Sequence, residues 1–170
     1  MAYPAVMANE TPLQSPLRLG SAPKSESRTQ FGALCFRRAK TKKAGHEILL
    51  VSSRDTGRWI LPKGWPVNGE TPAGAAALEA WEEAGVRGRV YPECVGHFSY
   101  QKFIDEEMSL PVIVAVFAIE VLRIDDDYPE ARERKRKWLS PKKAARRVAE
   151  PELRQLLTGF DPARLRRPDA

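Results

Sequence analysis

The chain has 170 residues, of which 42% are apolar and 29% charged. That length and balance fit one globular domain with a sizeable core, since a domain usually takes about 100 to 200 residues. No apolar run approaches the ~18 residues of a membrane span, and the first twenty residues lack the apolar core of a signal peptide, so we expect a cytoplasmic protein without a membrane partner. The two cysteines cannot form a disulfide framework, and neither they nor the two histidines show zinc-site spacing.

The charge balance is basic and uneven. Lys and Arg number 28 against 22 Asp and Glu, a formal charge of +6. Residues 1–122 carry 14 basic and 13 acidic side chains, while residues 123–170 carry 14 and 9. Within the second part, residues 132–147 hold nine Lys or Arg and a single acid, Glu133. Such a segment attracts phosphates, whether of a nucleic acid or of a small molecule.

Residues 1–27 are rich in Pro, Ser, Ala and Thr and lack a hydrophobic period, so we expect a flexible tail there. A folded domain is expected over 28–158 and a flexible basic tail over 159–170. The expected elements are strands at 30–38 and 46–54, a short strand at 58–64, a helix at 72–84, an extended segment at 89–103, a polar loop at 104–109, a buried strand at 110–122, a charged connection at 125–137, a short return to the core at 138–139, and helices at 141–148 and 151–157. Strands on both sides of one central helix indicate an α/β class, with a mixed sheet covered by helices.

The helix at 72–84 has the clearest boundaries. Thr71 is a typical N-cap, Pro72 occupies the first helical position, and Gly85 stands just past the end. Alanines on one side of this helix, with Trp81 as the one large residue among them, form an apolar face that allows close approach to a sheet.

The opposite face of the same helix is acidic. Glu79, Glu82 and Glu83 are three and four residues apart, so they share an arc of about 100°. Like charges at this spacing repel one another, and a purely structural helix would gain little from them. Mg²⁺ is commonly held by a few carboxylates together with substrate phosphates. From the spacing alone, a solvated acidic face is the alternative.

A longer pattern separates these alternatives. Gly64, Glu70 and residues 78–86 closely resemble the Nudix box, G-x5-E-x7-R-E-U-x-E-E-x-G-U with U aliphatic, and eight of its nine specified positions fit. A 23-residue signature with fixed gaps is highly specific. The resemblance covers residues 30–148 and implies the Nudix fold, an α/β/α sandwich with a mixed sheet in which the box forms a loop-helix-loop. It also implies a Mg²⁺-dependent or Mn²⁺-dependent hydrolase that cleaves diphosphate linkages.

The resemblance implies roles for the box residues. Glu79 and Glu83 are the expected principal metal ligands, the Gly64 carbonyl a further one, and Glu82 the general base or a ligand of a second ion. Metal ions neutralise the diphosphate and lower the pKa of bound water, and more than one ion is expected with substrate bound. Because related enzymes differ in their base, the loop residues Glu106 and Glu107 stay as alternatives.

The segments flanking the box resemble the branch of diphosphoinositol polyphosphate and diadenosine polyphosphate hydrolases. With the local basic charge, this favours a polyphosphorylated small molecule over nucleic acid, since only Trp138 interrupts the basic run as an aromatic residue. The oligomeric state stays open, a homodimer included. The candidate substrate-binding residues are Lys63, Arg37, Arg54, Arg58, Arg134 and Arg136.

Two departures qualify the resemblance. Leu78 stands where the box has arginine, and an arginine there could pair with Glu82 and hold it ionised and oriented. Lys137 stands just before Trp138, where the diphosphoinositol branch often has glutamate. The rival to an active enzyme is therefore a catalytically weakened Nudix-fold module that binds a phosphorylated ligand or RNA. Retention of all four box glutamates favours the enzyme.

Overall fold

The computed structural model describes residues 28–41 and 45–166. The predicted tail at 1–27 lies outside these residues. The predicted order of strands and helices is confirmed, except that the short strand at 58–64 is divided around Pro62, which has no N–H for a sheet hydrogen bond. The elements are β1 (Thr29–Arg38), β2 (His46–Ser52), β3 (Trp59–Ile60), β4 (Lys63–Gly64), α1 (Pro72–Ala84), β5 (Val86–Phe103), β6 (Ser109–Ile124), β7 (Arg136–Leu139), α2 (Pro141–Ala145), α3 (Pro151–Gly159) and a 3-10 turn (Pro162–Arg164).

The strands form one mixed sheet in the order β3-β2-β1-β6-β5, with β4 paired to β1 and β7 paired to β2. β1 and β6 are parallel, and the other pairs are antiparallel. β4 lies beside the first half of β1, where Phe31 is opposite Gly64 and Gly32 is opposite Lys63. The central strand thereby fixes the start of the Nudix-box segment.

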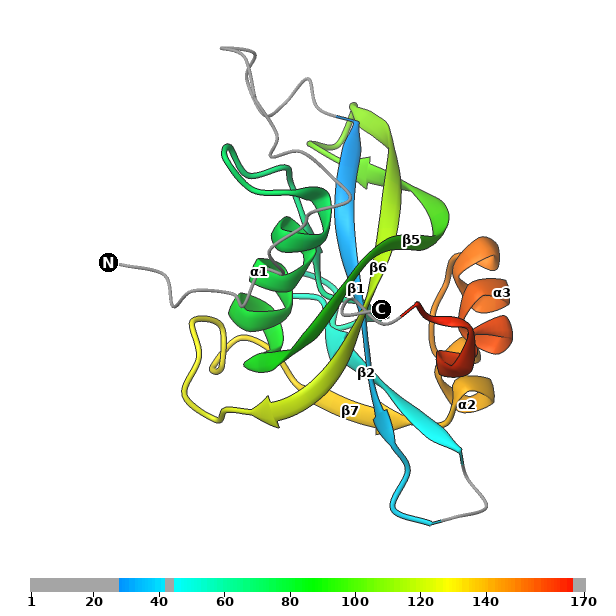
Figure 1. Cartoon of the computed structure of the whole chain (residues 1–170). Helices are drawn as coiled ribbons and strands as arrows, with labels where there is room; N and C mark the ends of the chain where they lie inside the picture. Colours follow the sequence, from blue (N-terminus) through cyan, green and yellow to red (C-terminus); the bar gives the residue numbers. More distant parts are fainter. Residues whose placement is uncertain (1–27, 42–44, 167–170) are drawn as a thin grey trace.

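The sheet is the middle layer of three. α1 covers one face, and α2 with α3 covers the other (Figure 1). Side chains of β1 alternate between the two cores: Phe31, Ala33 and Cys35 lie in the α1 core, whereas Leu34 and Phe36 lie in the α2 and α3 core. The predicted α/β/α sandwich with a mixed sheet is confirmed.

Helix α1 begins and ends at the predicted residues. The Thr71 hydroxyl accepts a hydrogen bond from the Gly74 N–H at 2.9 Å, and Gly85 ends the helix in the left-handed conformation with φ of 66°. Six alanines of α1 are buried against the sheet. Trp81 is only half-buried, with the Arg87 guanidinium 3.9 Å from its ring centroid, so the large residue lies at the edge of this interface.

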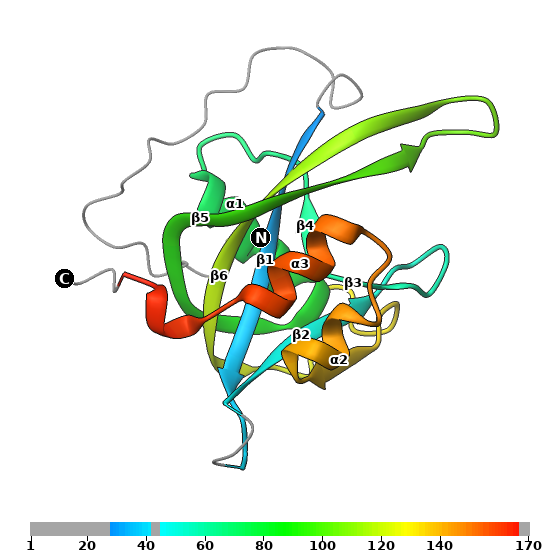
Figure 2. The ribbon, with the colours of Figure 1, turned by 90° about the vertical axis from the view of Figure 1, so that its right-hand side faces the viewer.

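Strands β5 and β6 continue beyond the body of the sheet as a long projecting hairpin (Figure 2). Its turn is tight because the Asp105 carboxylate accepts the backbone N–H groups of Glu107 and Met108, at 2.9 and 2.8 Å. Glu106 and Glu107 are exposed at this turn. Tyr100 of β5 lies beside Lys63 of β4, whose Nζ is 4.7 Å from the centroid of the Tyr100 ring. Strand β5 therefore borders the start of the Nudix-box segment.

The described chain continues to pack beyond residue 158, inside the region expected as a basic tail. The Phe160 ring lies 5.2 Å from that of Phe36 and 5.4 Å from the His46 ring, between centroids. Pro162–Arg164 then form a 3-10 turn. Among the helices of residues 28–41 and 45–166, none is long and apolar enough to cross a membrane.

Candidate functional site

The site begins where helix α1 approaches β4. The Glu79 carboxylate lies so close to Gly64 that a Cβ on residue 64 would overlap it. Only glycine leaves room for this approach, which explains the residue type at the first position of the box. The backbone of β4 and the Glu79 carboxylate therefore share one confined space.

Glu83 lies one helical turn further along the same face. Its side chain is only 6% exposed, and its Oε1 accepts a hydrogen bond from Arg134 Nη2 at 2.7 Å. Its Oε2 is buried and has no hydrogen-bond partner. A buried carboxylate oxygen without a partner is costly, so this atom is suited to a cation.

The electrostatics of the two carboxylates agree with this view. Burial raises the pKa of Glu79 to about 7, helped by the nearby charges of Glu82 and Glu130. Burial also raises the pKa of Glu83 to about 8, against the opposing effect of the Arg134 cation and with further repulsion from Glu79. The raised pKa values show that the nearby cations, Arg134 and Lys63, do not offset the burial of the two carboxylates, and a divalent ion would supply further positive charge.

The donor set fits a hard divalent cation such as Mg²⁺ or Mn²⁺. Glu79 and Glu83 offer carboxylate oxygens, and one of these oxygens is orphaned. Gly64 brings a backbone close to the Glu79 carboxylate without a side chain in the way. Glu82 is half-exposed on the neighbouring part of the helix, close enough to raise the pKa of Glu79.

Glu70 has a supporting position at the start of the helix. A Cβ on Gly74 would lie 2.5 Å from Glu70 Oε2 and 3.1 Å from Thr71 Oγ1, so the Glu70 carboxylate packs over the first turn of α1.

Sequence reasoning missed Glu130, which comes to the site from the segment between β6 and β7. Its carboxylate pairs with Arg134 and lies 3.7 Å from Arg54, and its backbone N–H donates to the Glu82 carbonyl at 3.0 Å. The one sequence signal for Glu130 is its four-residue spacing from Arg134, which is typical of an ion pair within one turn. Nothing in that spacing indicates that both meet α1.

Lys63 connects the acidic cluster to the hairpin. It is half-buried, and burial lowers its pKa, with Glu83 as the main opposing charge. Its Nζ lies 4.7 Å from the centroid of the Tyr100 ring, and the Tyr100 hydroxyl donates to Gln30 Oε1 at 2.7 Å. Next along β5, Lys102 Nζ lies 4.8 Å from the Trp65 ring centroid. Two lysines thus border the site, and sequence reasoning named only the first.

The other predicted substrate-binding residues have hydrogen-bond or ion-pair partners within the protein itself. Arg37 pairs with Glu47 at 2.8 Å and lies over the Trp138 ring. Arg54 pairs with Glu130 and with Glu133, and Arg58 donates to Thr56 Oγ1 at 3.2 Å.

Arg136 is bound to the end of helix α1. Its Nη1 donates to the Ala84 and Asp125 carbonyls, and its Nη2 pairs with Asp126 at 2.6 Å. Arg134 does reach the acidic cluster, where its guanidinium binds carboxylates of the protein itself.

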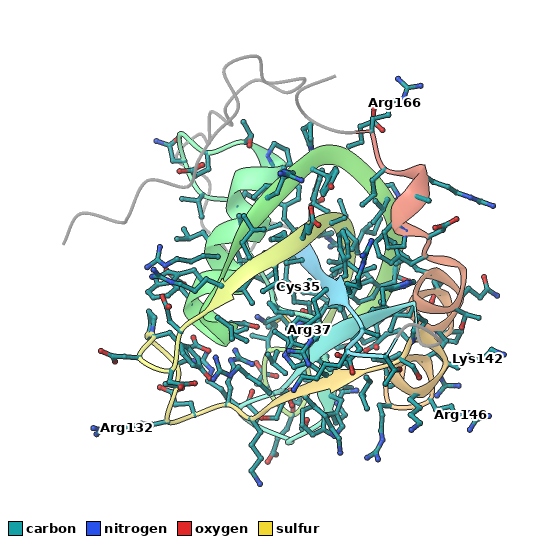
Figure 3. All side chains as sticks on the ribbon, turned by 60° about the horizontal axis from the view of Figure 1, so that its bottom comes forward. Cys35, Arg37, Arg132, Lys142, Arg146 and Arg166 are labelled. Atoms are coloured by element: carbon teal, nitrogen blue, oxygen red, sulfur yellow. The ribbon has the colours of Figure 1, made fainter. Side chains whose placement is uncertain are left out.

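The basic segment 132–147 is divided by the fold. Its first part borders α1, whereas the exposed Lys142, Lys143, Arg146 and Arg147 belong to α2 and the turn after it, on the other side of the sheet. Figure 3 shows Arg132 on one side of the molecule and Lys142 and Arg146 on the other. The basic residues that lie together in the sequence at 132–147 therefore do not form one surface.

The sandwich, the glycine-to-carboxylate approach and the three helix glutamates define a Nudix protein. The model of the NUDIX domain matches residues 27–160, and the chain belongs to this family. Its relatives are hydrolases, so the predicted class of enzyme, a Nudix pyrophosphohydrolase, is confirmed.

Among curated proteins, the chain is 30% identical over 145 residues to Nudix hydrolase 16, mitochondrial, of Arabidopsis thaliana, covering 79% of this chain and 80% of that protein. It is 35% identical over 108 residues to diphosphoinositol polyphosphate phosphohydrolase 3-beta of Bos taurus, covering 62% of this chain and 59% of the relative. The chain thus spans about three fifths of the length of that second relative. The predicted resemblance to the diphosphoinositol polyphosphate branch is confirmed at this level.

Solved structures agree on the fold. The Ap4A hydrolase of C. elegans superposes with a TM-score of 0.52 at 22% identity, covering 76% of this chain and 92% of that one. The dihydroneopterin triphosphate pyrophosphohydrolase of E. coli gives a TM-score of 0.59 at 19% identity, covering 79% and 94%. At such identities the likeness extends to the fold alone.

Proposed function

We propose that this protein is a Mg²⁺-dependent pyrophosphohydrolase that cleaves a diphosphate linkage in a polyphosphorylated small molecule, either a diphosphoinositol polyphosphate or a diadenosine polyphosphate. The observation that carries the proposal is the buried, unpartnered Oε2 of Glu83 beside the Glu79 carboxylate and the bare backbone of Gly64. We expect the enzyme in the cytoplasm.

In this proposal Glu79, Glu83 and the Gly64 carbonyl hold the metal. The metal supplies charge neutralisation for the diphosphate and a more acidic bound water. Glu82, half-exposed on the same helix, takes the proton from the attacking water. Lys63 contacts a substrate phosphate as a point charge, since its side chain lies beside the acidic cluster, where Glu83 favours the charged ammonium.

The test is a substrate panel offered to the purified full chain. It contains diphosphoinositol polyphosphates, diadenosine polyphosphates, ADP-ribose and nucleoside triphosphates, with and without Mg²⁺, and release of phosphate or nucleotide is measured. We expect release from one of the first two classes, only with metal. If one ligand binds tightly and no compound releases phosphate or nucleotide, the result would contradict the proposal of an enzyme and favour a binding module.

Glu83→Gln provides the residue-level test. The amide keeps the shape of the side chain but removes the charge that holds the cation, so we expect turnover to fall by about 10²-fold or more. Glu152→Gln is the matched control, because this exposed glutamate lies on α3, where it accepts a hydrogen bond from Ser99. Retained activity in Glu83→Gln would reject the metal assignment.

A further inference from the structure

Arg134 stands at the centre of a buried ion network. Its side chain is only 5% exposed. Its Nη2 donates to Glu83 Oε1 at 2.7 Å, its Nη1 donates to the Ser52 carbonyl at 3.0 Å, and its Nε pairs with Glu130. Because each of the three guanidinium nitrogens has a protein acceptor, this arginine is poorly placed to bind a substrate phosphate.

The bond to Glu83 is one-sided. Arg134 engages Oε1, while Oε2 of the same carboxylate stays buried without a partner. A carboxylate held through one oxygen has its other oxygen oriented, which is what a metal ligand needs. The geometry therefore prepares Glu83 for a second, opposite interaction.

Helix α1 has no cation of its own for this task. Its sequence, PAGAAALEAWEEA, contains no Lys or Arg, and Leu78 stands at the arginine position of the box. The acidic cluster must take its positive charge from elsewhere in the fold. Arg134 comes from the segment between β6 and β7, fifty-one residues after Glu83.

Glu130 holds this arginine from the opposite side. Its carboxylate pairs with Arg134 across one helix-like turn, and its backbone N–H donates to the Glu82 carbonyl at 3.0 Å. The Arg134 N–H donates in turn to the Glu130 carbonyl at 3.1 Å. The segment is thus joined to the backbone of α1 at the residue before Glu83.

We infer that Arg134 is the positioning residue of Glu83: it brings a cation from the β6–β7 segment to a helix that has no Lys or Arg of its own, and Glu130 holds Arg134 in place. This inference rests on the proposed function, because it gives Glu83 the role of a metal ligand. Groups that orient a metal ligand typically contribute about 10-fold to 100-fold to metal affinity or activity.

The experiment compares Arg134→Gln, Arg134→Lys and Glu130→Gln with the wild-type full chain. Mn²⁺ affinity is measured by electron paramagnetic resonance, and kcat and KM are measured at saturating Mg²⁺. Arg132→Gln is the matched control, since it removes the same charge from an exposed position of the same segment (Figure 3). Because Arg134→Gln leaves a buried carboxylate without its partner and can impair folding, Arg134→Lys keeps the charge while losing the fork of donors.

We expect Arg134→Gln to weaken Mn²⁺ binding and lower kcat by about 10-fold to 100-fold with little change in KM, and Arg134→Lys to recover part of both losses. Glu130→Gln should fall between the wild type and Arg134→Gln, and Arg132→Gln should match the wild type. If the Arg134 variants keep wild-type Mn²⁺ affinity and kcat, the inference about Arg134 is overturned while the proposed function stands. This holds whatever the melting temperature of the variants. A wild-type chain without Mn²⁺ binding or metal-dependent hydrolysis would overturn the proposed function as well.

Discussion

At the scale of single residues, the candidate site depends on the side chain that Gly64 lacks. The Glu79 carboxylate occupies the volume that a Cβ on residue 64 would need. Pairing of β4 with β1 opposite Phe31 leaves the strand little freedom to move away. A methyl group at residue 64 would therefore displace the Glu79 carboxylate.

We expect Gly64→Ala to lower kcat by about 10²-fold or more, because a displacement of about 1 Å at a reacting centre can cost that much. Steady-state kinetics at saturating Mg²⁺ and a Mn²⁺ titration measure the effect. Gly159→Ala, at the end of α3, is the control, since nothing lies within 4 Å of its added Cβ. If Gly64→Ala keeps both wild-type kcat and Mn²⁺ affinity, Glu79 is not held against β4 in the working enzyme.

Residues whose partners are local could be predicted from the sequence, and those with distant partners could not. Thr71 and Gly85 act on groups within the helix they terminate, so their types were enough to place both ends of α1. The basic run in which Arg134 lies predicts that it binds substrate, whereas the structure pairs it with Glu83. Its partner Glu83 is brought to it by the packing of the β6–β7 segment on α1, for which no periodic pattern exists.

At the scale of elements, strand β7 divides the basic segment. Arg136 and Trp138 point to the α1 side, where Arg136 binds the last carbonyl of the helix and Trp138 packs in the α1 core. Lys137 and Leu139 point to the other side, where the lysine lies over Trp59 and the leucine enters the second core. A strand alternates its side chains, so a linear run of charge cannot form one surface.

Lys63 and α2 provide a direct comparison between the two sides. Lys63→Met keeps the stem that packs near Tyr100 but removes the charge beside the acidic cluster, so we expect KM to rise about tenfold or more with a smaller change in kcat. The double change Lys142→Met and Lys143→Met, on the exposed face of α2, should leave both constants unchanged. A larger effect from the α2 pair, measured with the substrate that the panel identifies, would move the phosphate-binding surface to that side of the sheet.

At the scale of the whole molecule, the buried carboxyl groups of the metal-free site make the folded state less stable as pH rises. The pKa values of Glu79 and Glu83 lie at about 7 and about 8 when folded, above the ordinary value of 4.5, chiefly through burial. Between about pH 4.5 and 8 these two carboxyl groups therefore bind more protons in the folded chain than in the unfolded chain, so their contribution to the free energy of unfolding falls as pH rises. Asp125, whose pKa is lowered by hydrogen bonds from Arg123 and Arg87, acts only in a more acidic range.

We expect the melting temperature of the metal-free chain to fall by several degrees from pH 5 to pH 8, a loss of stability that follows from the two raised pKa values. Saturating Mg²⁺ or Mn²⁺ at pH 8 should reverse the loss, because a ligand at 100 times its Kd adds about 2.7 kcal/mol. Scanning calorimetry with and without chelator measures both effects. The double variant Glu79→Gln and Glu83→Gln should show neither the fall nor the recovery. A metal-free wild type that is equally stable at both pH values would mean that these carboxylates are not buried against one another, and the metal would then have no preformed site to fill.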